Sequence, residues 1–513
     1  MCGILFAQGK KINKNNFSTA LECMHHRGPD ATGYHVDNER YFGQKRLKIL
    51  DLSDESNQPF YDSTKTSCII FNGEIYNYRE LAIKHNIHLR TSSDTELLIE
   101  LYLLKGEAML NELNGMFAFI IYNTITHDIF AARDRLGVKP LFYYHENDLL
   151  IFSSEVSSIL SLTDSAEPDE IAIRQYKKLR GFYNNRTIYK KISQFPSASF
   201  SKNGKISKYW DVDFSPKEPP TDEELKELVE SSIRYRLISD VSVGSFLSGG
   251  LDSSIVATLA HKPDTWTIGF EDNNEFEYAR IVSEKIHSKH REIPISNKEF
   301  LEIAKFMIQK RKEPLCVPNE VLIYKMSLAV KEFNTVILCG EGADELFFGY
   351  DRIFRWANEN KWDLRGFDQF YSYGKHQDDE ILEDVLSPYT SRYTNAIDIV
   401  ASFFQTAHLQ NLLKRLDHSS MLASIEGREP FVDYRLIERM SGVPFDYKMK
   451  NGIVKDPLKR IFSDILPDEV VNRKKVGFPV NLKNVFAEYM PESTQDANFD
   501  VWFDFNLKTL FNS

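Results

Sequence analysis

The chain has 513 residues, a length that predicts two or three domains instead of a single core. Hydrophobic residues make up 42% of it and charged residues 27%, as in soluble globular proteins. The net charge of -11, from 63 basic and 74 acidic residues, argues against nucleic acid as a partner.

The cysteines and the hydropathy pattern indicate a cytoplasmic protein. The five cysteines are odd in number, widely spaced and never arranged as C-x-x-C, which argues against a disulfide framework and a zinc site. The most apolar run, residues 116–122, is too short to span a bilayer, and no signal peptide opens the chain. We therefore expect no membrane partner.

The chain begins Met1-Cys2-Gly3, and the small residue at position two favours removal of the initiator methionine. Cys2 would then be the first residue, next to a free α-amino group whose pKa is about 7.7–8.0. Such an amine can activate the thiol as a nucleophile at neutral pH. A cysteine at this position by chance is the alternative, and this residue alone does not decide between them.

Further motifs follow Cys2 in a fixed order, and together they resemble the class II (N-terminal nucleophile) glutamine amidotransferases. They are His26-Arg27-Gly28-Pro29-Asp30, Arg46-Leu47, Asn72-Gly73-Glu74-Ile75-Tyr76-Asn77 and Ser93-Asp94-Thr95-Glu96. Short apolar runs between Gly, Asn and Asp turns predict an α+β domain of stacked antiparallel sheets flanked by helices. The resemblance makes this an Ntn-hydrolase fold.

The same motifs suggest a glutamine site. The Asn72 amide and the Gly73 N–H can form an oxyanion hole for the intermediate on Cys2. The resemblance implies that Arg46 binds the glutamine α-carboxylate, and that Glu74 and Asp94 bind its α-ammonium. As isolated residues, these acids would be surface residues in most proteins.

Two positions depart from the family pattern without removing a catalytic group. Gln44 stands where histidine is common, and Pro196-Ser197-Ala198 stands where a Pro-Pro-Gly turn is usual.

A segment rich in proline and charge, residues 211–220, predicts the domain boundary, because proline resists both helices and central strands. We therefore expect a glutaminase domain at 1–210, a linker at 211–220 and a synthetase domain at 221–513. Thr221-Asp222-Glu223-Glu224 predicts a capping box at the start of a helix.

An apolar run at 241–247, a glycine-rich stretch at 248–254 and a helical pattern at 255–260 predict a strand, a turn and a helix. Paired glycines let a ligand approach the backbone, and the free amides of the helix start favour an anion. An ordinary capped turn is the alternative. The string Ser248-Gly249-Gly250-Leu251-Asp252-Ser253-Ser254 resembles the pyrophosphate loop of ATP pyrophosphatases, and its surroundings resemble glutamine-hydrolysing asparagine synthetases.

Strand patterns at 265–270, 291–295 and 335–338 alternate with helical patterns at 275–289, 297–310 and 320–333. Alternation of this kind predicts an α/β domain with a parallel sheet and ligands at its carboxyl edge. The resemblance implies an ATP site made of Leu247, Ser248, Gly249, Gly250, Asp252, Ser253, Ile268, Cys339 and Gly340.

A second glycine-rich motif, Cys339-Gly340-Glu341-Gly342-Ala343-Asp344-Glu345, carries three acids in five residues. An acidic helix start explains part of this charge but not the glycines. By resemblance, Asp252 and Asp344 hold Mg²⁺, Glu341 serves the acceptor as a base, and Lys455 stabilises charge on the phosphate. The segments 417–421 and 426–433 match a family helix and turn, for which we expect an architectural role.

The resemblance implies a glutamine- and ATP-dependent ligase that adenylates a carboxylate and amidates it with ammonia carried inside the protein, most simply aspartate to asparagine. Cys316-Val317-Pro318 replaces a family segment whose arginine helps to hold aspartate. Another cation, such as Arg311 or Lys312, would then hold it, or the acceptor is another carboxylate, such as a sugar uronic acid. A non-catalytic regulatory relative and a plain glutaminase are the remaining alternatives, and a homodimer is left open.

Overall fold

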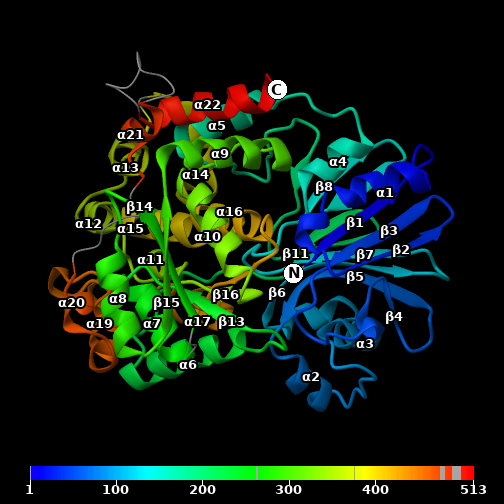
Figure 1. The fold of residues 1–513 in the computed structure, drawn as a ribbon, viewed down its shortest axis with the longest axis horizontal. Coiled ribbons are helices and arrows are strands. Elements are labelled where there is room, and N and C mark those ends of the chain that lie inside the picture. Colours follow the sequence, from blue (N-terminus) through cyan, green and yellow to red (C-terminus); the bar gives the residue numbers. More distant parts are fainter. Residues whose placement is uncertain (1, 262–263, 375, 474–479, 488–497, 513) are drawn as a thin grey trace.

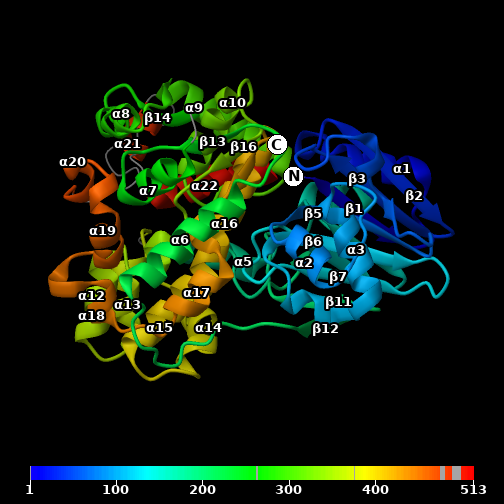
Figure 2. The same cartoon turned by 90° about the horizontal axis from the view of Figure 1, so that it is seen from below.

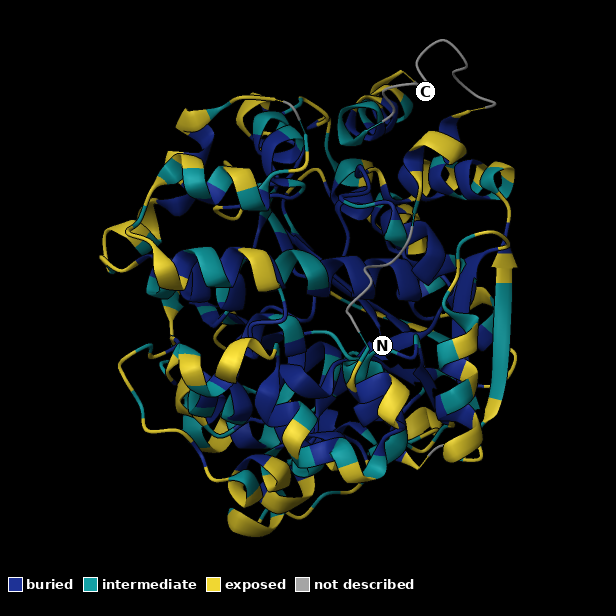
Figure 3. Ribbon diagram, turned by 90° about the vertical axis from the view of Figure 1, so that its left-hand side faces the viewer, coloured by how far each residue is buried: buried dark blue, intermediate teal, exposed yellow. Residues whose placement is uncertain are grey.

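The computed structural model describes residues 2–261, 264–374, 376–473, 480–487 and 498–512. The first part of the chain forms two six-stranded sheets, and the remainder surrounds a third sheet (Figure 1). In Figure 3 the buried residues gather in the middle of the molecule, and the exposed ones lie on the outer surfaces of the surrounding helices. No helix in the described part of the chain combines the length and hydropathy needed to cross a bilayer.

The first two sheets are antiparallel and lie face to face. The first has the order β10 (Ser193–Gln194), β8 (Phe142–Glu146), β9 (Leu149–Ser153), β1 (Gly3–Gln8), β3 (Arg40–Arg46) and β2 (Ala31–Asp37). The second has the order β12 (Lys205–Lys208), β11 (Ser199–Lys202), β7 (Ile129–Arg133), β6 (Gly115–Asn123), β5 (Ser67–Ile75) and β4 (Phe60–Tyr61).

Alternation along β1 explains the layers. Ile4 and Phe6 pack in one apolar cluster with residues of β5 and β6, so they face the second sheet. Leu5 and Ala7 point the other way and pack with residues of the helices α1 (Lys14–Glu22) and α4 (Val156–Leu162). The helices α2 (Tyr78–Lys84) and α3 (Asp94–Lys105) contribute to the core outside the second sheet. The predicted stack of antiparallel sheets flanked by helices is confirmed.

The third sheet is parallel and has the order β15 (Lys289–Ile295), β14 (Asp264–Phe270), β13 (Val243–Phe246), β16 (Val336–Leu338) and β17 (Glu426–Arg428). The parallel sheet and four of its five strands, β13, β14, β15 and β16, agree with the sequence. We did not predict β17, because three residues with two charges lack the apolar signature of a strand. The chain leaves β13 toward β14 on one side and later pairs β16 on the other, so the glycine-rich loop lies where the strand order reverses.

Helices cover this sheet on both faces and extend beyond it. They are α6 (Asp222–Arg236), α7 (Leu251–Ala260), α8 (Phe276–Lys285), α9 (Asn297–Arg311), α10 (Asn319–Val330), α11 (Ala343–Leu346), α12 (Asp351–Glu359), α13 (Leu364–Tyr371), α14 (Asp379–Thr390), α15 (Ala396–Phe403), α16 (Leu409–Met421), α17 (Tyr434–Met440), α18 (Phe445–Lys448), α19 (Asp456–Phe462), α20 (Asp468–Val471), α21 (Leu482–Phe486) and α22 (Phe499–Phe511). Thr221 caps α6 as predicted, accepting a hydrogen bond from the Glu224 N–H at 3.2 Å.

The segment that joins the two parts runs from β12 along the underside of the molecule to α6 (Figure 2). It is tied to α17, since Trp210 Nε1 donates to Glu438 at 2.6 Å and Lys217 Nζ donates to the Glu438 carbonyl at 2.8 Å. The chain end adds a second tie, because Phe503 of α22 packs against Tyr176 of α5 (Glu170–Leu179) with ring centroids 4.8 Å apart. The two parts therefore share apolar and polar contacts.

Candidate active sites

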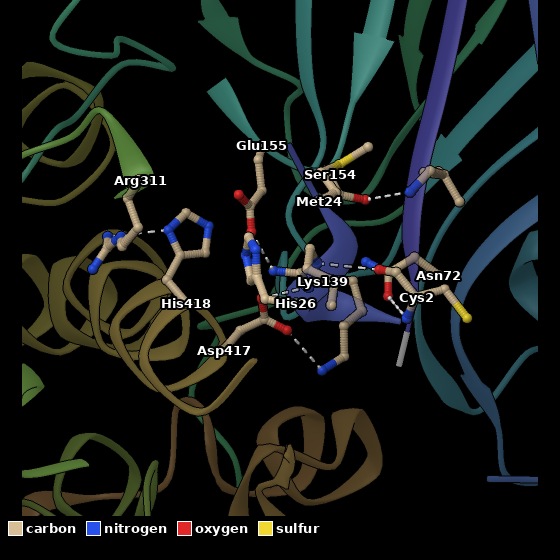
Figure 4. A network of polar contacts seen from close by, with 12 residues as sticks. Cys2, Met24, His26, Asn72, Lys139, Ser154, Glu155, Arg311, Asp417 and His418 are labelled. Atoms are coloured by element: carbon tan, nitrogen blue, oxygen red, sulfur yellow. Dashed lines mark hydrogen bonds and ion pairs between the residues drawn. The ribbon is translucent and has the colours of Figure 1, made fainter. Parts of the chain in front are cut away.

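Cys2 lies immediately before β1, beside Asn72 of β5 (Figure 4). Its N–H donates to Asn72 Oδ1 at 3.0 Å, and its carbonyl accepts from Arg27 Nε at 3.2 Å. Burial raises the pKa of the Cys2 thiol, and the charge of Arg46 lowers it in part. A thiol in this state needs a base to become a nucleophile.

Asn72 and Gly73 present donors next to Cys2. Because Asn72 Oδ1 is occupied by the Cys2 N–H, the amide nitrogen faces the other way, and it is buried without a hydrogen-bond partner among the described residues. Gly73 has φ of 155°, and a Cβ there would lie 2.1 Å from the Met116 carbonyl oxygen. Position 73 therefore requires glycine, and the Asn72 side-chain amide can donate a hydrogen bond to a ligand oxygen.

Arg46, at the end of β3, is held by the loop that follows it. Its Nη atoms donate to the carbonyl of Ser53 at 2.8 Å, to Asn57 Oδ1 at 2.8 Å, to the carbonyl of Leu50 at 3.3 Å and to that of Asp51. The guanidinium therefore organises residues 50–57, and its binding to the glutamine carboxylate stays a prediction.

Glu74 and Asp94 are both buried, and their charges interact. Asp94 Oδ2 accepts the Ile75 N–H at 2.8 Å. Burial raises the pKa of Asp94 to about 7, and burial together with Glu426 and Asp94 raises the pKa of Glu74 well above its usual range. Glu74 Oε2 has no hydrogen-bond partner among the described residues. Two buried carboxyl groups close to one another favour a cationic ligand.

β17 of the parallel sheet contacts Glu74, although we had expected an architectural role for this segment. Arg428 Nη2 lies 3.7 Å from Glu74 Oε1, and Arg428 Nε donates to Glu426 at 2.5 Å. Its Nη1 donates to the carbonyls of Arg236 and Ile238, at 2.8 and 2.7 Å. The sequence carried no signal for this contact, because the residues that meet are more than three hundred positions apart.

A buried ion network joins the two parts beside Cys2 (Figure 4). Asp417 of α16 lies 2.8 Å from Arg27 Nη2 and 3.2 Å from Lys139 Nζ. Glu155 lies 2.8 Å from His26 Nε2 and 3.4 Å from Arg27 Nη1. One arginine thus contacts the Cys2 carbonyl and a carboxylate of the second part.

The two departures from the family pattern are both accommodated. Gln44 is buried and donates from Nε2 to the Phe71 carbonyl at 2.9 Å. Ala198 has φ of 52°, the left-handed conformation that a glycine would adopt without strain.

The glycine-rich loop connects β13 to α7 as predicted. Gly249 has φ of 71°, and a Cβ there would lie 2.5 Å from the Tyr278 carbonyl carbon. The loop is closed by hydroxyl groups, since Ser248 N donates to Ser253 Oγ at 3.2 Å and the two hydroxyls lie 3.0 Å apart. The turn is therefore fixed with the amides of the start of α7 at its edge.

Lys455 brings the two glycine-rich motifs together. Its Nζ lies 2.6 Å from Asp344 Oδ1 and also contacts Asp252. Burial lowers the pKa of Lys455, but the two carboxylates outweigh it and raise the pKa overall. A Cβ on Gly340 would lie 2.8 Å from the Asp252 Cβ, so the loops touch directly. Three predicted site residues from distant parts of the chain meet here.

The remaining predicted ATP contacts lie at the carboxyl ends of the neighbouring strands. Ile268 belongs to β14, and Leu247 donates from its N–H to the Trp266 carbonyl at 2.8 Å. Cys339 follows β16 and donates to the Arg428 carbonyl at 3.0 Å. The predicted ATP contacts therefore lie along one edge of the sheet, and their binding of ATP stays a prediction.

The Asp252 and Asp344 carboxylates suit Mg²⁺, which typically takes one or two carboxylates plus substrate phosphates. The described residues contain no group of three or more metal-binding side chains. Phosphate oxygens and water would therefore have to complete the coordination. This pair fits such a role.

The acid that we predict to serve the acceptor, Glu341, is paired with a cation that the sequence did not assign. Glu341 is paired with Arg415 of α16 at 2.5 Å. Arg311, which we considered as a substitute for the missing family arginine, is buried and paired with Glu320 at 2.6 Å and with His418 Nδ1 at 3.1 Å. Arg415 is therefore the cation in contact with Glu341.

Comparisons with known proteins agree with both halves. The family model described as asparagine synthase matches residues 224–498, and the one described as glutamine amidotransferase domain matches residues 1–210. The chain is 30% identical to asparagine synthetase [glutamine-hydrolyzing] 1 of Bacillus subtilis, covering 93% of this chain and 86% of the relative. It is 30% identical to asparagine synthetase [glutamine-hydrolyzing] 3 of the same organism, covering 93% and 87%. The chain belongs to the glutamine-hydrolysing asparagine synthetase family.

Proposed function

We propose that the chain uses ATP to activate the side-chain carboxylate of aspartate and converts it to an amide with ammonia from glutamine. The enzyme is a glutamine- and ATP-dependent amidotransferase, and aspartate is the proposed acceptor. The observation that carries the proposal is the contact of Lys455 with both Asp252 and Asp344, which joins the pyrophosphate loop to the acidic loop. We assign the glutaminase half to residues 1–210 and the synthetase half to 221–513. Five free cysteines support a cytoplasmic setting.

In the glutaminase half, Cys2 acts as the first residue after removal of Met1. Its α-amine takes the thiol proton, and the sulfur attacks the glutamine amide carbon. Asn72 Nδ2 and the Gly73 N–H donate to the oxyanion. The α-ammonium gives the proton to the departing nitrogen, so ammonia leaves, and water then hydrolyses the thioester to glutamate and the free thiol. Glu74 and Asp94 hold the substrate ammonium.

In the synthetase half, an oxygen of the acceptor carboxylate attacks the α-phosphorus of ATP, and pyrophosphate leaves. Lys455 stabilises the negative charge that develops there. Bound Mg²⁺ would supply further positive charge at Asp252 and Asp344. Ammonia then attacks the acyl-adenylate, Glu341 takes a proton from the nitrogen, and AMP leaves.

Arg415 supports aspartate as the acceptor substrate. Its guanidinium lies beside Glu341, where it can bind the second carboxylate of aspartate. The names of the relatives support the same choice. A sugar uronic acid is the competing acceptor. Arg311, which we considered as the cation that holds aspartate, is instead paired with Glu320.

The test is pyrophosphate release from Mg-ATP with ammonia as the nitrogen source, comparing aspartate with a panel of uronic acids. Ammonia bypasses Cys2, so only the acceptor site is examined. Release with aspartate together with asparagine formation supports the proposal. Pyrophosphate release with a uronate but not with aspartate would show that aspartate is not the acceptor. The absence of release with every carboxylate would overturn the proposed function.

A further inference from the structure

Glu429 is a buried carboxyl group next to Arg428, which contacts residues of both proposed sites. It follows β17 directly, and the preceding Arg428 reaches Glu74 in the glutamine pocket. The Arg428 carbonyl accepts a hydrogen bond from the N–H of Cys339 at 3.0 Å. Cys339 is the first residue of the second glycine-rich motif, which carries Glu341. Arg428 therefore contacts both Glu74 and the second glycine-rich motif, and Glu429 is the next residue in the chain.

A small cavity lies at this junction. Its volume is about 20 Å³, enough for one molecule the size of water or ammonia. Both parts of the chain line it, and Glu429 is its carboxyl group from the second part. Tyr76, Asn114, Asp134 and Arg135 from the first part also line it, with Arg236 and Tyr434 from the second.

The Glu429 carboxyl group has no hydrogen bond or ion pair with any residue that the structure describes. Burial raises its pKa to about 8, and Asp417 and Glu341 add to the rise while Lys139 and Arg236 oppose it. The other titratable groups around it are Cys339 on the acceptor loop and Tyr76, Asp134, Arg135 and Tyr434 in the cavity. At neutral pH this carboxyl is mostly a neutral acid with its proton available.

We propose that Glu429 is a proton-exchanging relay for ammonia that passes from the glutamine site to the acceptor site. This inference rests on the proposed function. The carboxylic acid gives its proton to ammonia, forming an ammonium–carboxylate pair in the cavity. The same proton then returns to Glu429 and releases ammonia toward Glu341, so the exchange is balanced and needs no other reactant. The raised pKa keeps either state from becoming a trap.

The first experiment compares Glu429→Gln, which keeps the shape but removes the acidic proton, with Glu429→Asp and the wild type. Glu438→Gln is the matched control, because Glu438 on α17 accepts a hydrogen bond from Trp210 and does not line the cavity. The readouts are amide formed per glutamate released, glutaminase rate and ammonia-driven pyrophosphate release.

The proposal expects Glu429→Gln to lower amide per glutamate several-fold, with glutaminase and ammonia-driven release unchanged at saturating ammonia. Glu429→Asp should recover part of the coupling, and Glu438→Gln should match the wild type. Unchanged coupling in Glu429→Gln would overturn the relay. An equal loss of ammonia-driven release would also overturn it, because the residue would then serve the acceptor site.

A second readout is independent of the acceptor. Addition of ammonium chloride to the full-length protein at neutral pH should remove a protonated-carboxyl band from the difference infrared spectrum, and sodium chloride should not. Glu429→Gln should lack this change. A wild-type protein that forms no pyrophosphate with any carboxylate defeats the proposed function alone, whereas a band that ammonia leaves in place defeats the relay.

Discussion

Arg27 and Asp417 are 390 positions apart in the sequence, and their side chains meet at 2.8 Å in the buried boundary between the two parts of the molecule. The same arginine donates to the carbonyl of Cys2. Cys2, the proposed nucleophile, is therefore linked through Arg27 to α16, which also carries Arg415, the partner of Glu341. One helix contacts both sites.

Replacement of Asp417 by Asn should destabilise the protein and loosen this attachment. It leaves Arg27 and Lys139 buried without their shared carboxylate, a loss of about 3–5 kcal/mol for a broken buried pair. Denaturant unfolding measures the change. Asp211→Asn, which breaks an exposed pair with Arg392, is the control and should cost at most about 1 kcal/mol. Equal effects of the two variants would contradict the structural role of Asp417.

Replacement of Lys455 by Met should reduce ammonia-driven pyrophosphate release by roughly a hundredfold, the usual effect of removing a group that stabilises transition-state charge. The glutaminase rate should stay near that of the wild type, because the ion pairs of Lys455 with described residues are to Asp252 and Asp344 of the synthetase loops. Lys459→Met, one turn along α19, serves as the control. Equal losses of pyrophosphate release in the two variants would contradict a specific role of Lys455 in stabilising charge on the phosphate.

Glutamine binding should weaken as the pH falls below about 7. Burial raises the pKa of Asp94 to about 7, so the carboxylate is charged above this value and protonated below it. A neutral Asp94 no longer attracts the substrate ammonium, and the KM for glutamine should rise at low pH. The KM measured across this range tests the prediction, with the KM for ATP in the ammonia reaction as the control. A glutamine KM that does not change would exclude Asp94 as the ammonium ligand.

Gly73→Ala should abolish glutaminase activity and destabilise the protein. Its φ of 155° and the Met116 carbonyl oxygen 2.1 Å from a built Cβ leave no room for a methyl group. Gly204→Ala is the matched control, since φ is 85° but nothing lies within 4 Å of its Cβ. It should cost only about 1–2 kcal/mol of left-handed strain. Glutaminase activity and thermal unfolding distinguish the two, and equal losses would show that crowding at Gly73 is unimportant.

The sequence predicted the features that depend on neighbouring residues. Short apolar runs between Gly, Asn and Asp turns predicted the stacked antiparallel sheets, and the succession of strand and helix patterns predicted the parallel sheet. The glycines at 249 and 250 indicated a tight turn between β13 and α7, and the structure has one there. Ordered motifs placed Cys2, Asn72 and Glu74 in one family-like pocket, although their roles stay predictions.

The tertiary structure decided which distant residues meet. Arg428 at Glu74, Arg415 at Glu341 and the engagement of Arg311 by Glu320 follow no local pattern. β17 escaped prediction for the same reason, since its three residues become a strand only because β16 offers a free edge. Periodicity and turn chemistry act over a few residues, whereas a buried charge selects its partner only after packing has brought remote elements together.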